Sequence, residues 1–398
     1  MFKRCILAVL VVLLSGALHG MDLARASGGE IYYESRPDEV ALYLSNIAFV
    51  RDTVMLPGGN ETRVLLPPGT YPNTLMLTEN GARVRNYRIT PQSPDVYSDV
   101  YSSTYVSSAS AYILAWDSDV AADATREVKL EYLLPGAVWT PTYDMTIIDD
   151  QSVDMSFFAE IQNSALILDE TTVYLVAGRV NLEEQVDQVS QVTMNQYAVG
   201  YSNESVTLPS AGVGTVDLQH VYSLGTVSAE PGDIVYSNIA GATFAARKQI
   251  VWNAAMQQET DVIYKVRNDT DVPLAEGIVR VYQNNLFMGS DFIETTPIGS
   301  EGSVTVGSMP DVRVHRTQSQ EYKGGTTKDY YFNTVTLEMS NFGTEDLSLL
   351  VLDTWLDNAW DFEYSLEPQR GQDNQLRWEV TIPAGETLTI TYQFLTDY

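Results

Sequence analysis

The sequence predicts an all-β protein with two immunoglobulin-like β-sandwich domains that follow a cleaved signal peptide. Apolar and polar residues alternate along many short segments, turn residues interrupt these segments at intervals of roughly 8 to 12 residues, and helical patterns are nearly absent. The alternation is clearest in residues 127–132 and 387–394. Pro-Gly turns in segments 57–59, 67–69 and 383–385 separate neighbouring strands, because proline fixes φ and glycine permits positive φ.

A weak internal repeat supports this fold class. Asn163, Asn268 and Asn341 each end a strand-like segment, precede a short polar turn and are followed by a leucine that begins the next segment. Asparagine suits such turns because its side chain mimics a backbone turn and tolerates the left-handed region. The repeat predicts two or three related strand–turn–strand units.

Residues 1–26 have the features of a secretory signal peptide. Lys3 and Arg4 precede the apolar run 6–14, and Ala24-Arg25-Ala26 provides an Ala-x-Ala cleavage site. The alternative is an uncleaved membrane anchor, but the apolar run is short for a membrane-spanning helix. We therefore expect an extracytoplasmic protein (periplasmic, cell-surface or secreted) with no transmembrane span in the mature chain.

Two domains are expected after the signal peptide, at residues 27–235 and 236–398. The first includes a Ser/Tyr-rich linker, 91–111, and a long polar loop, 183–233. The single cysteine, Cys5, lies in the signal peptide. Cleavage therefore leaves a chain without disulfides, cysteine nucleophiles or thiolate metal sites.

The acidic composition excludes one class of partner. Cleavage removes three of 23 basic and one of 52 acidic residues, which changes the formal net charge from −29 to −31. Nucleic-acid binding depends on clustered Lys and Arg, so no nucleic-acid partner is expected.

Catalytic and metal motifs are missing from the sequence. His220 and His315 of the mature chain lie in different segments without a second ligand at metal spacing. The pairs Asp117/Asp119 and Asp149/Asp150 do not resemble a calcium loop. We expect no enzyme, no cofactor and no metal.

The segment 353–361 offers one alternative to this prediction. Asp353, Asp357 and Trp360 combine carboxylates with an aromatic ring, as a carbohydrate-binding or glycan-active site does. The competing interpretation is a strand edge and turn whose tryptophan rings cover the sandwich core. Separately, Asn60, Asn203 and Asn268 each begin a glycosylation sequon, although Asn268 also serves the repeated turn.

Ordered motifs give the chain a family resemblance. The specific part is residues 262–314, and the matching segments are 48–51, 133–139 with Tyr143, 175–181, 262–268, 273–282, 296–299, 306–307 and 311–312. They resemble the mucoidy inhibitor A-like family (domain of unknown function 4139), whose members are β-rich and exported. The resemblance offers no catalytic residues to carry over. The chain departs from it by lacking the coiled-coil segment and by having Trp355-Leu356 after Asp353, where relatives place a proline.

The sequence thus predicts an exported, non-enzymatic protein of the cell envelope or surface that acts by binding or scaffolding. The alternatives are the carbohydrate site at 353–361 and a self-assembling surface-layer component.

Overall fold

The computed structural model describes residues 23–25, 31–34, 36–59, 61–92, 111–121, 123–177, 213–216, 219–324, 329–355, 357–371 and 374–397. The all-β prediction is confirmed, because η1 (Pro72–Thr74), one turn of 3₁₀ helix, is the only helical element among these residues. No helix in the described chain is long and apolar enough to cross a membrane. Residues 1–22 and 26 lie outside the described residues, so the signal peptide stays a prediction.

The chain forms two compact units. Unit 1 contains residues 1–139 and 161–235, and unit 2 contains residues 140–160 and 236–398. Unit 1 is discontinuous, because the hairpin formed by β11 (Ala137–Ile147) and β12 (Ser152–Asn163) starts and ends in unit 1 and has its middle in unit 2. The chain leaves unit 1 for the second time between Val235 and Tyr236.

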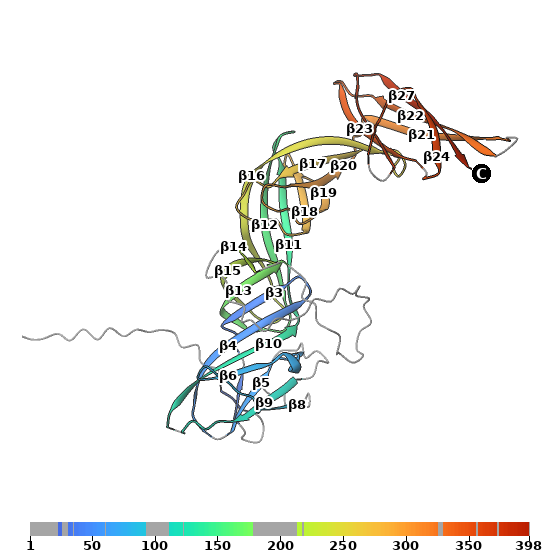
Figure 1. The fold of residues 1–398 in the computed structure, drawn as a ribbon. Helices are drawn as coiled ribbons and strands as arrows, with labels where there is room; N and C mark the ends of the chain where they lie inside the picture. Colours follow the sequence, from blue (N-terminus) through green and yellow to red (C-terminus); the bar gives the residue numbers. More distant parts are fainter. Residues whose placement is uncertain are drawn as a thin grey trace, which may run out of the picture. The chain divides into compact units, whose positions relative to one another are not determined.

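Unit 1 contains two sheets (Figure 1). The first has five strands, in the order β1 (Leu23–Arg25), β2 (Ile31–Glu34), β5 (Glu61–Leu66), β9 (Ala111–Asp117) and β8 (Arg88–Gln92). The second has eight, in the order β14 (Val213–Val216), β15 (Gln219–Ala229), β13 (Leu168–Ala177), β3 (Glu39–Tyr43), β4 (Ile47–Pro57), β10 (Thr125–Pro135), β6 (Met76–Glu79) and β7 (Ala82–Arg83). The predicted alternation in β10 holds, since Val128, Leu130 and Tyr132 are fully buried.

The structure corrects part of the predicted loop 183–233. Residues 183–212 and 217–218 lie outside the described residues, but β14 and β15 occupy most of the remainder, and β15 pairs with β13 from Ala229 to His220. Two register shifts interrupt this ladder. A β-bulge breaks the strict period of two, which explains why the strand pattern is weak in the sequence. Of the predicted linker 91–111, residues 93–110 lie outside the described part, Pro91 and Gln92 end β8, and Ala111 begins β9.

A long sheet runs through unit 2 (Figure 1). Its order is β19 (Leu286–Ile293), β18 (Gly277–Gln283), β11, β12, β16 (Ile234–Asn253), β23 (Leu347–Thr354), β26 (Gln375–Ile382) and β25 (Gln369–Arg370). Two further strands extend from β16, namely β17 (Asp261–Arg267) and β20 (Glu301–Gly307). The backbone N–H of Thr305 in β20 donates to Asp291 Oδ2 in β19 at 2.5 Å. The row β19, β18, β11, β12, β16, β17 and β20 therefore curls so that its two end strands, β19 and β20, lie next to each other.

A sandwich forms the C-terminal part of unit 2. Its second sheet has the order β21 (Val312–Lys323), β22 (Tyr330–Asn341), β27 (Thr387–Asp397) and β24 (Ala359–Tyr364). Val335 and Leu337 of this sheet pack with Leu349, Val351 and Trp378 of the long sheet in one buried cluster.

The predicted repeat is confirmed as three corners with the same hydrogen bonding. Asn163 and Asn341 are the last residues of β12 and β22, and Asn268 directly follows β17. The exposed fractions of Asn163, Asn341 and Asn268 are 2%, 3% and 0%. Each Nδ2 donates to a carbonyl three or four residues later in its own turn, and each Oδ1 accepts from a backbone N–H of that turn. The side chain thus satisfies backbone groups that a buried turn would otherwise leave unpaired.

Each corner also binds a second, distant turn. The Nδ2 atoms of Asn163, Asn268 and Asn341 donate to the carbonyls of Glu230, Thr296 and Ile382 at 3.2, 3.0 and 3.0 Å. A proline follows each of these acceptors, and a glycine with φ of 105°, 79° or 73° follows in the turn. Only glycine adopts these φ values without strain, so a Pro-Gly turn faces each asparagine.

Candidate functional site

Asp353 of the predicted acidic and aromatic segment lies inside the C-terminal sandwich. Its exposed fraction is 0%. Oδ2 accepts hydrogen bonds from Arg316 Nε at 2.9 Å and from the Tyr392 hydroxyl at 2.8 Å, and Oδ1 accepts from the backbone N–H of Thr354 at 2.8 Å. Burial and the neighbouring Asp353 charge raise the pKa of Tyr392, so its hydroxyl stays a donor. Asp353 therefore stabilises the fold and does not face a surface ligand.

The two other members of the predicted site reach the surface. Asp357 is exposed and accepts a hydrogen bond from Asn374 Nδ2, and Trp360 is 37% exposed. Trp355, by contrast, packs against the sandwich core, as the competing interpretation expects for a tryptophan in this segment. Of the three predicted residues, Asp357 and Trp360 alone remain accessible to a ligand.

An arginine covers the neighbouring aromatic rings. The Arg370 guanidinium carbon lies 5.9, 5.1 and 5.6 Å from the ring centroids of Trp355, Phe362 and Tyr364, and Nη2 donates to the Tyr364 hydroxyl at 2.9 Å. These are cation–π distances. The sequence analysis missed this cluster, although the spacing of Phe362 and Tyr364, two residues apart in β24, is its signal.

The predicted glycosylation sites have different outcomes. Asn60 and Asn203 lie outside the described residues and stay predictions. Asn268 is the buried asparagine of the second corner, and its Nδ2 donates to the carbonyls of Val272 and Thr296, both at 3.0 Å. The folded chain therefore uses this nitrogen in the turn and does not present it for glycan attachment.

Asp149, which the sequence analysis weighed as a calcium ligand, has a local structural role. Its Oδ1 accepts from the backbone N–H of Gln151 and from Ser152 Oγ, both at 2.8 Å. The hydrogen bond from Gln151, followed by that from Ser152, lowers the pKa of the Asp149 carboxyl. In the described part of the chain, no three His, Cys, Asp or Glu side chains are grouped so as to hold a metal.

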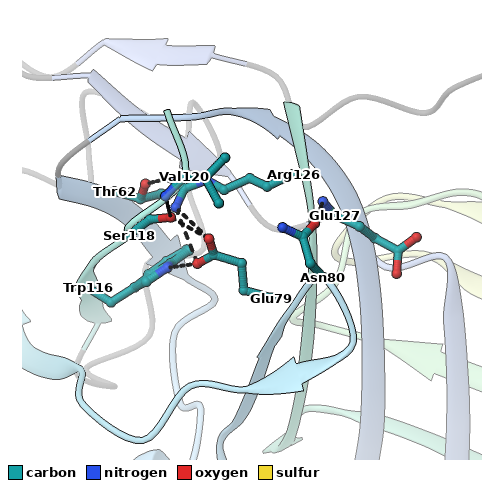
Figure 2. Close-up of polar contacts among 8 residues, drawn as sticks. All are labelled: Thr62, Glu79, Asn80, Trp116, Ser118, Val120, Arg126 and Glu127. Carbon is teal, nitrogen blue, oxygen red and sulfur yellow. Dashed lines mark hydrogen bonds and ion pairs between the residues drawn. The ribbon is translucent and has the colours of Figure 1, made fainter. Parts of the chain in front are cut away.

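Unit 1 contains a buried polar network that the sequence analysis did not find (Figure 2). Arg126 in β10 is 1% exposed, and its Nη1 lies 3.3 Å from both carboxylate oxygens of Glu79 in β6. Its Nη2 donates to Thr62 in β5, and its guanidinium carbon lies 5.6 Å from the ring centroid of Trp116 in β9. The network therefore connects the two sheets of unit 1.

Glu79 is the centre of this network. Its carboxylate also accepts from Trp116 Nε1 at 2.9 Å and from Ser118 Oγ. Burial raises the pKa of Glu79, but the hydrogen bonds from Ser118 and Trp116 and the Arg126 charge outweigh it, so the pKa lies below its usual value. Figure 2 shows the neighbouring Glu127 side chain pointing away from the network.

The sequence contains a signal for both buried ion pairs. Arg126 is two residues before Val128, in phase with the inward-facing residues of β10, and Asp353 is two residues after Val351, in phase with those of β23. A charged residue at an inward-facing position near the end of a strand indicates a buried ion pair, because a buried charge without a partner is costly.

The largest exposed apolar group of unit 2 lies on the β18–β19 hairpin. Ile278, Leu286, Phe287, Met288 and Phe292 are 47%, 67%, 60%, 44% and 52% exposed. Ile278 pairs directly with Phe292 across the two strands, and the Tyr282 and Phe287 rings meet edge to face at 5.7 Å. By the register of the two strands, Ile278 and Tyr282 lie on one face of β18 with Arg280 between them, and Leu286 lies next to the turn on the face opposite to Phe287.

Comparison with known proteins gives a family match. A family model described as "Domain of unknown function (DUF4139)" matches residues 128–398. No curated protein and no solved structure matches the chain.

Proposed function

We propose that this chain, which belongs to the DUF4139 family, is an exported, non-enzymatic protein of the cell envelope or surface that acts by binding or scaffolding. The narrower resemblance to the mucoidy inhibitor A-like family is part of the same proposal.

One observation carries the binding role. The β18–β19 hairpin exposes five large apolar side chains, including Leu286 at 67% and Phe287 at 60%. Exposed apolar patches of this kind are typical of interaction surfaces. Asp353 and Asn268, which had the chemistry of a ligand or modification site, are instead buried in hydrogen bonds of the fold.

Export is supported by the sequence of residues 1–26. Lys3 and Arg4, the apolar run 6–14 and Ala24-Arg25-Ala26 follow the order that secretory signals have. The acidic composition suits an exposed environment, because like charges keep a protein soluble and monomeric.

The export half is tested by fractionating cells that make the full chain with a C-terminal tag. We expect the tagged protein outside the cytoplasm with Ser27 as its first residue, as determined by mass spectrometry of the N-terminal peptide. Val11→Asp should block export, because a charge in the apolar run opposes insertion, whereas the control Ser35→Asp should leave it intact. An unprocessed wild-type chain in the cytoplasm would contradict the proposal.

The binding half is tested by retention on washed cell envelopes. Phe292→Asp on the hairpin should reduce retention at least tenfold, and Phe342→Asp, at a residue 68% exposed elsewhere in unit 2, should not. Equal retention of wild type and Phe292→Asp would remove the hairpin from the proposal. Loss of retention in Asp357→Ala or Trp360→Ala alone would instead favour the carbohydrate alternative.

A further inference from the structure

We propose that the tip of the β18–β19 hairpin inserts into the interfacial region of a lipid bilayer that carries little net charge. The inference rests on the proposed function, because it names lipid as the envelope component that the chain binds. It concerns docking from one side of the membrane and requires no membrane-spanning segment.

The turn of the hairpin is tight, with two residues, and apolar residues follow it directly. Asn284 and Asn285 have φ of 50° and 63°, the left-handed conformations that a two-residue type I′ turn requires. Such a turn continues the twist of its two strands, so the ribbon stays paired up to Gln283 and Leu286. Leu286 therefore follows the turn directly and is 67% exposed.

Apolar side chains occupy both faces of the ribbon at its tip. Phe287 pairs with Tyr282, and Leu286 pairs with Gln283. Successive residues of a strand point to opposite faces, so Leu286 and Phe287 project from opposite sides of the same ribbon. A protein groove covers one face of a ribbon, whereas lipid surrounds an inserted tip on both sides. This arrangement distinguishes a bilayer from a protein partner.

The charge pattern of the hairpin agrees with lipid. No charged residue occurs from Val281 to Ser290, in a chain of which 19% is charged. The nearest charge on β18, Arg280, is paired with Asp144 at 2.8 Å. Charges are expensive at bilayer depth, whereas Tyr, Asn and Gln tolerate the headgroup region. A formal net charge of −29 makes an anionic bilayer an unfavourable partner, so the occupant is a zwitterionic surface.

The test is flotation of the purified mature chain, residues 27–398, with protein-free phosphatidylcholine vesicles, so that the apolar run 6–14 does not itself contribute to lipid binding. We expect wild type to float with the vesicles and the double variant Leu286→Asp/Phe287→Asp to lose at least tenfold in partitioning. The matched controls are Met256→Asp and Phe342→Asp, which place the same charge at residues 83% and 68% exposed elsewhere in unit 2. Both controls should float like wild type.

A second readout locates the contact. Trp introduced as Phe287→Trp should be quenched by brominated acyl chains, and Phe342→Trp should add no quenching. Addition of phosphatidylglycerol to the vesicles should weaken binding.

Three results of the flotation test would overturn the inference: no flotation of wild type, equal flotation of the double variant, or a requirement for anionic lipid. A dimer in sedimentation velocity that Phe287→Asp dissociates would also overturn it, because a second copy of the chain would then occupy the hairpin. Failure with vesicles combined with hairpin-dependent retention on envelopes would reject lipid and leave the proposed function intact. Failure of both would reject both.

Discussion

Units 1 and 2 hold arginine–carboxylate pairs that differ in which member is buried. In unit 1 the Arg126 side chain is 1% exposed and that of Glu79 is 11% exposed, whereas in unit 2 the Arg316 side chain is 22% exposed and that of Asp353 is 0% exposed. Removal of the more exposed member, Glu79 or Arg316, leaves a buried charge without its partner. Removal of the buried member, Arg126 or Asp353, leaves a charge that lies nearer to water. Arginine stays charged at any relevant pH, whereas a stranded carboxylate can take up a proton. The same substitution should therefore have different costs in the two units.

The largest effect is expected from Glu79→Gln, which strands the buried Arg126 charge. The free energy of unfolding of unit 1 should fall by about 3–5 kcal/mol, the usual cost of breaking a buried ion pair from one side. Chemical denaturation of the full chain together with hydrogen exchange of β10 peptides measures the loss in unit 1. The control Glu127→Gln changes an exposed carboxylate of β10, next to Arg126, and should stay within about 0.5 kcal/mol. Equal effects of the two variants would show that Arg126 does not depend on Glu79.

Arg316→Met should have the second largest effect, because it strands Asp353. We expect a loss of about 2–3 kcal/mol in unit 2 at neutral pH, from a buried acceptor that keeps only Tyr392 and Thr354 as donors. Chemical denaturation of wild type and variant, together with hydrogen exchange of β23 peptides, measures the loss in unit 2. A variant as stable as wild type would contradict the argument.

Sequence reasoning found the features that depend on local pattern and missed those that depend on distant partners. The strands and the turns at Asn163, Asn268 and Asn341 follow from alternation and turn chemistry within about ten residues. Arg126 and Glu79 are 47 residues apart, and no sequence feature near either residue identifies the other as its partner. Asp353 was noticed for its neighbouring tryptophans, although its phase with Val351 indicated burial. The register shift between Ser223 and Gly225 interrupts the alternation of β15 and weakens its signal in the sequence.

Smaller losses are expected when the buried member is removed. Asp353→Asn and Arg126→Met should each reduce the free energy of unfolding by about 1–2 kcal/mol, because the remaining partner keeps other contacts. Arg316 can still reach water and Gln318, and Glu79 keeps its bonds to Trp116 and Ser118. Parallel denaturation of the four single variants compares the pairs. The interpretation would be reversed if substitution of the buried member of a pair lowered the free energy of unfolding more than substitution of its more exposed partner in the same unit.

The smallest effect is the pH dependence of unit 1. The folded pKa of Glu79 lies below its ordinary value of 4.5, so its contribution is present above about pH 4.5 and is lost as the pH falls through the lower, folded value. Glu131 acts in the same direction, because the hydrogen bonds from Lys129 and Arg51 outweigh burial and lower its pKa. Glu79→Gln should therefore reduce the acid slope of unit 1 stability without abolishing it. An unchanged slope in an acid titration followed by hydrogen exchange would contradict the assignment.

The three asparagine corners also set an order of folding. The contacts from Asn268, Asn341 and Asn163 to their distant turns close loops of 28, 41 and 67 residues. Loop-closure entropy grows slowly with length, so the longest loop costs about 0.8 kcal/mol more to close than the shortest. The difference favours early formation of the Asn268 corner during refolding, and the Asn163 corner, which must gather β12 and the turn after β15, is expected to form last.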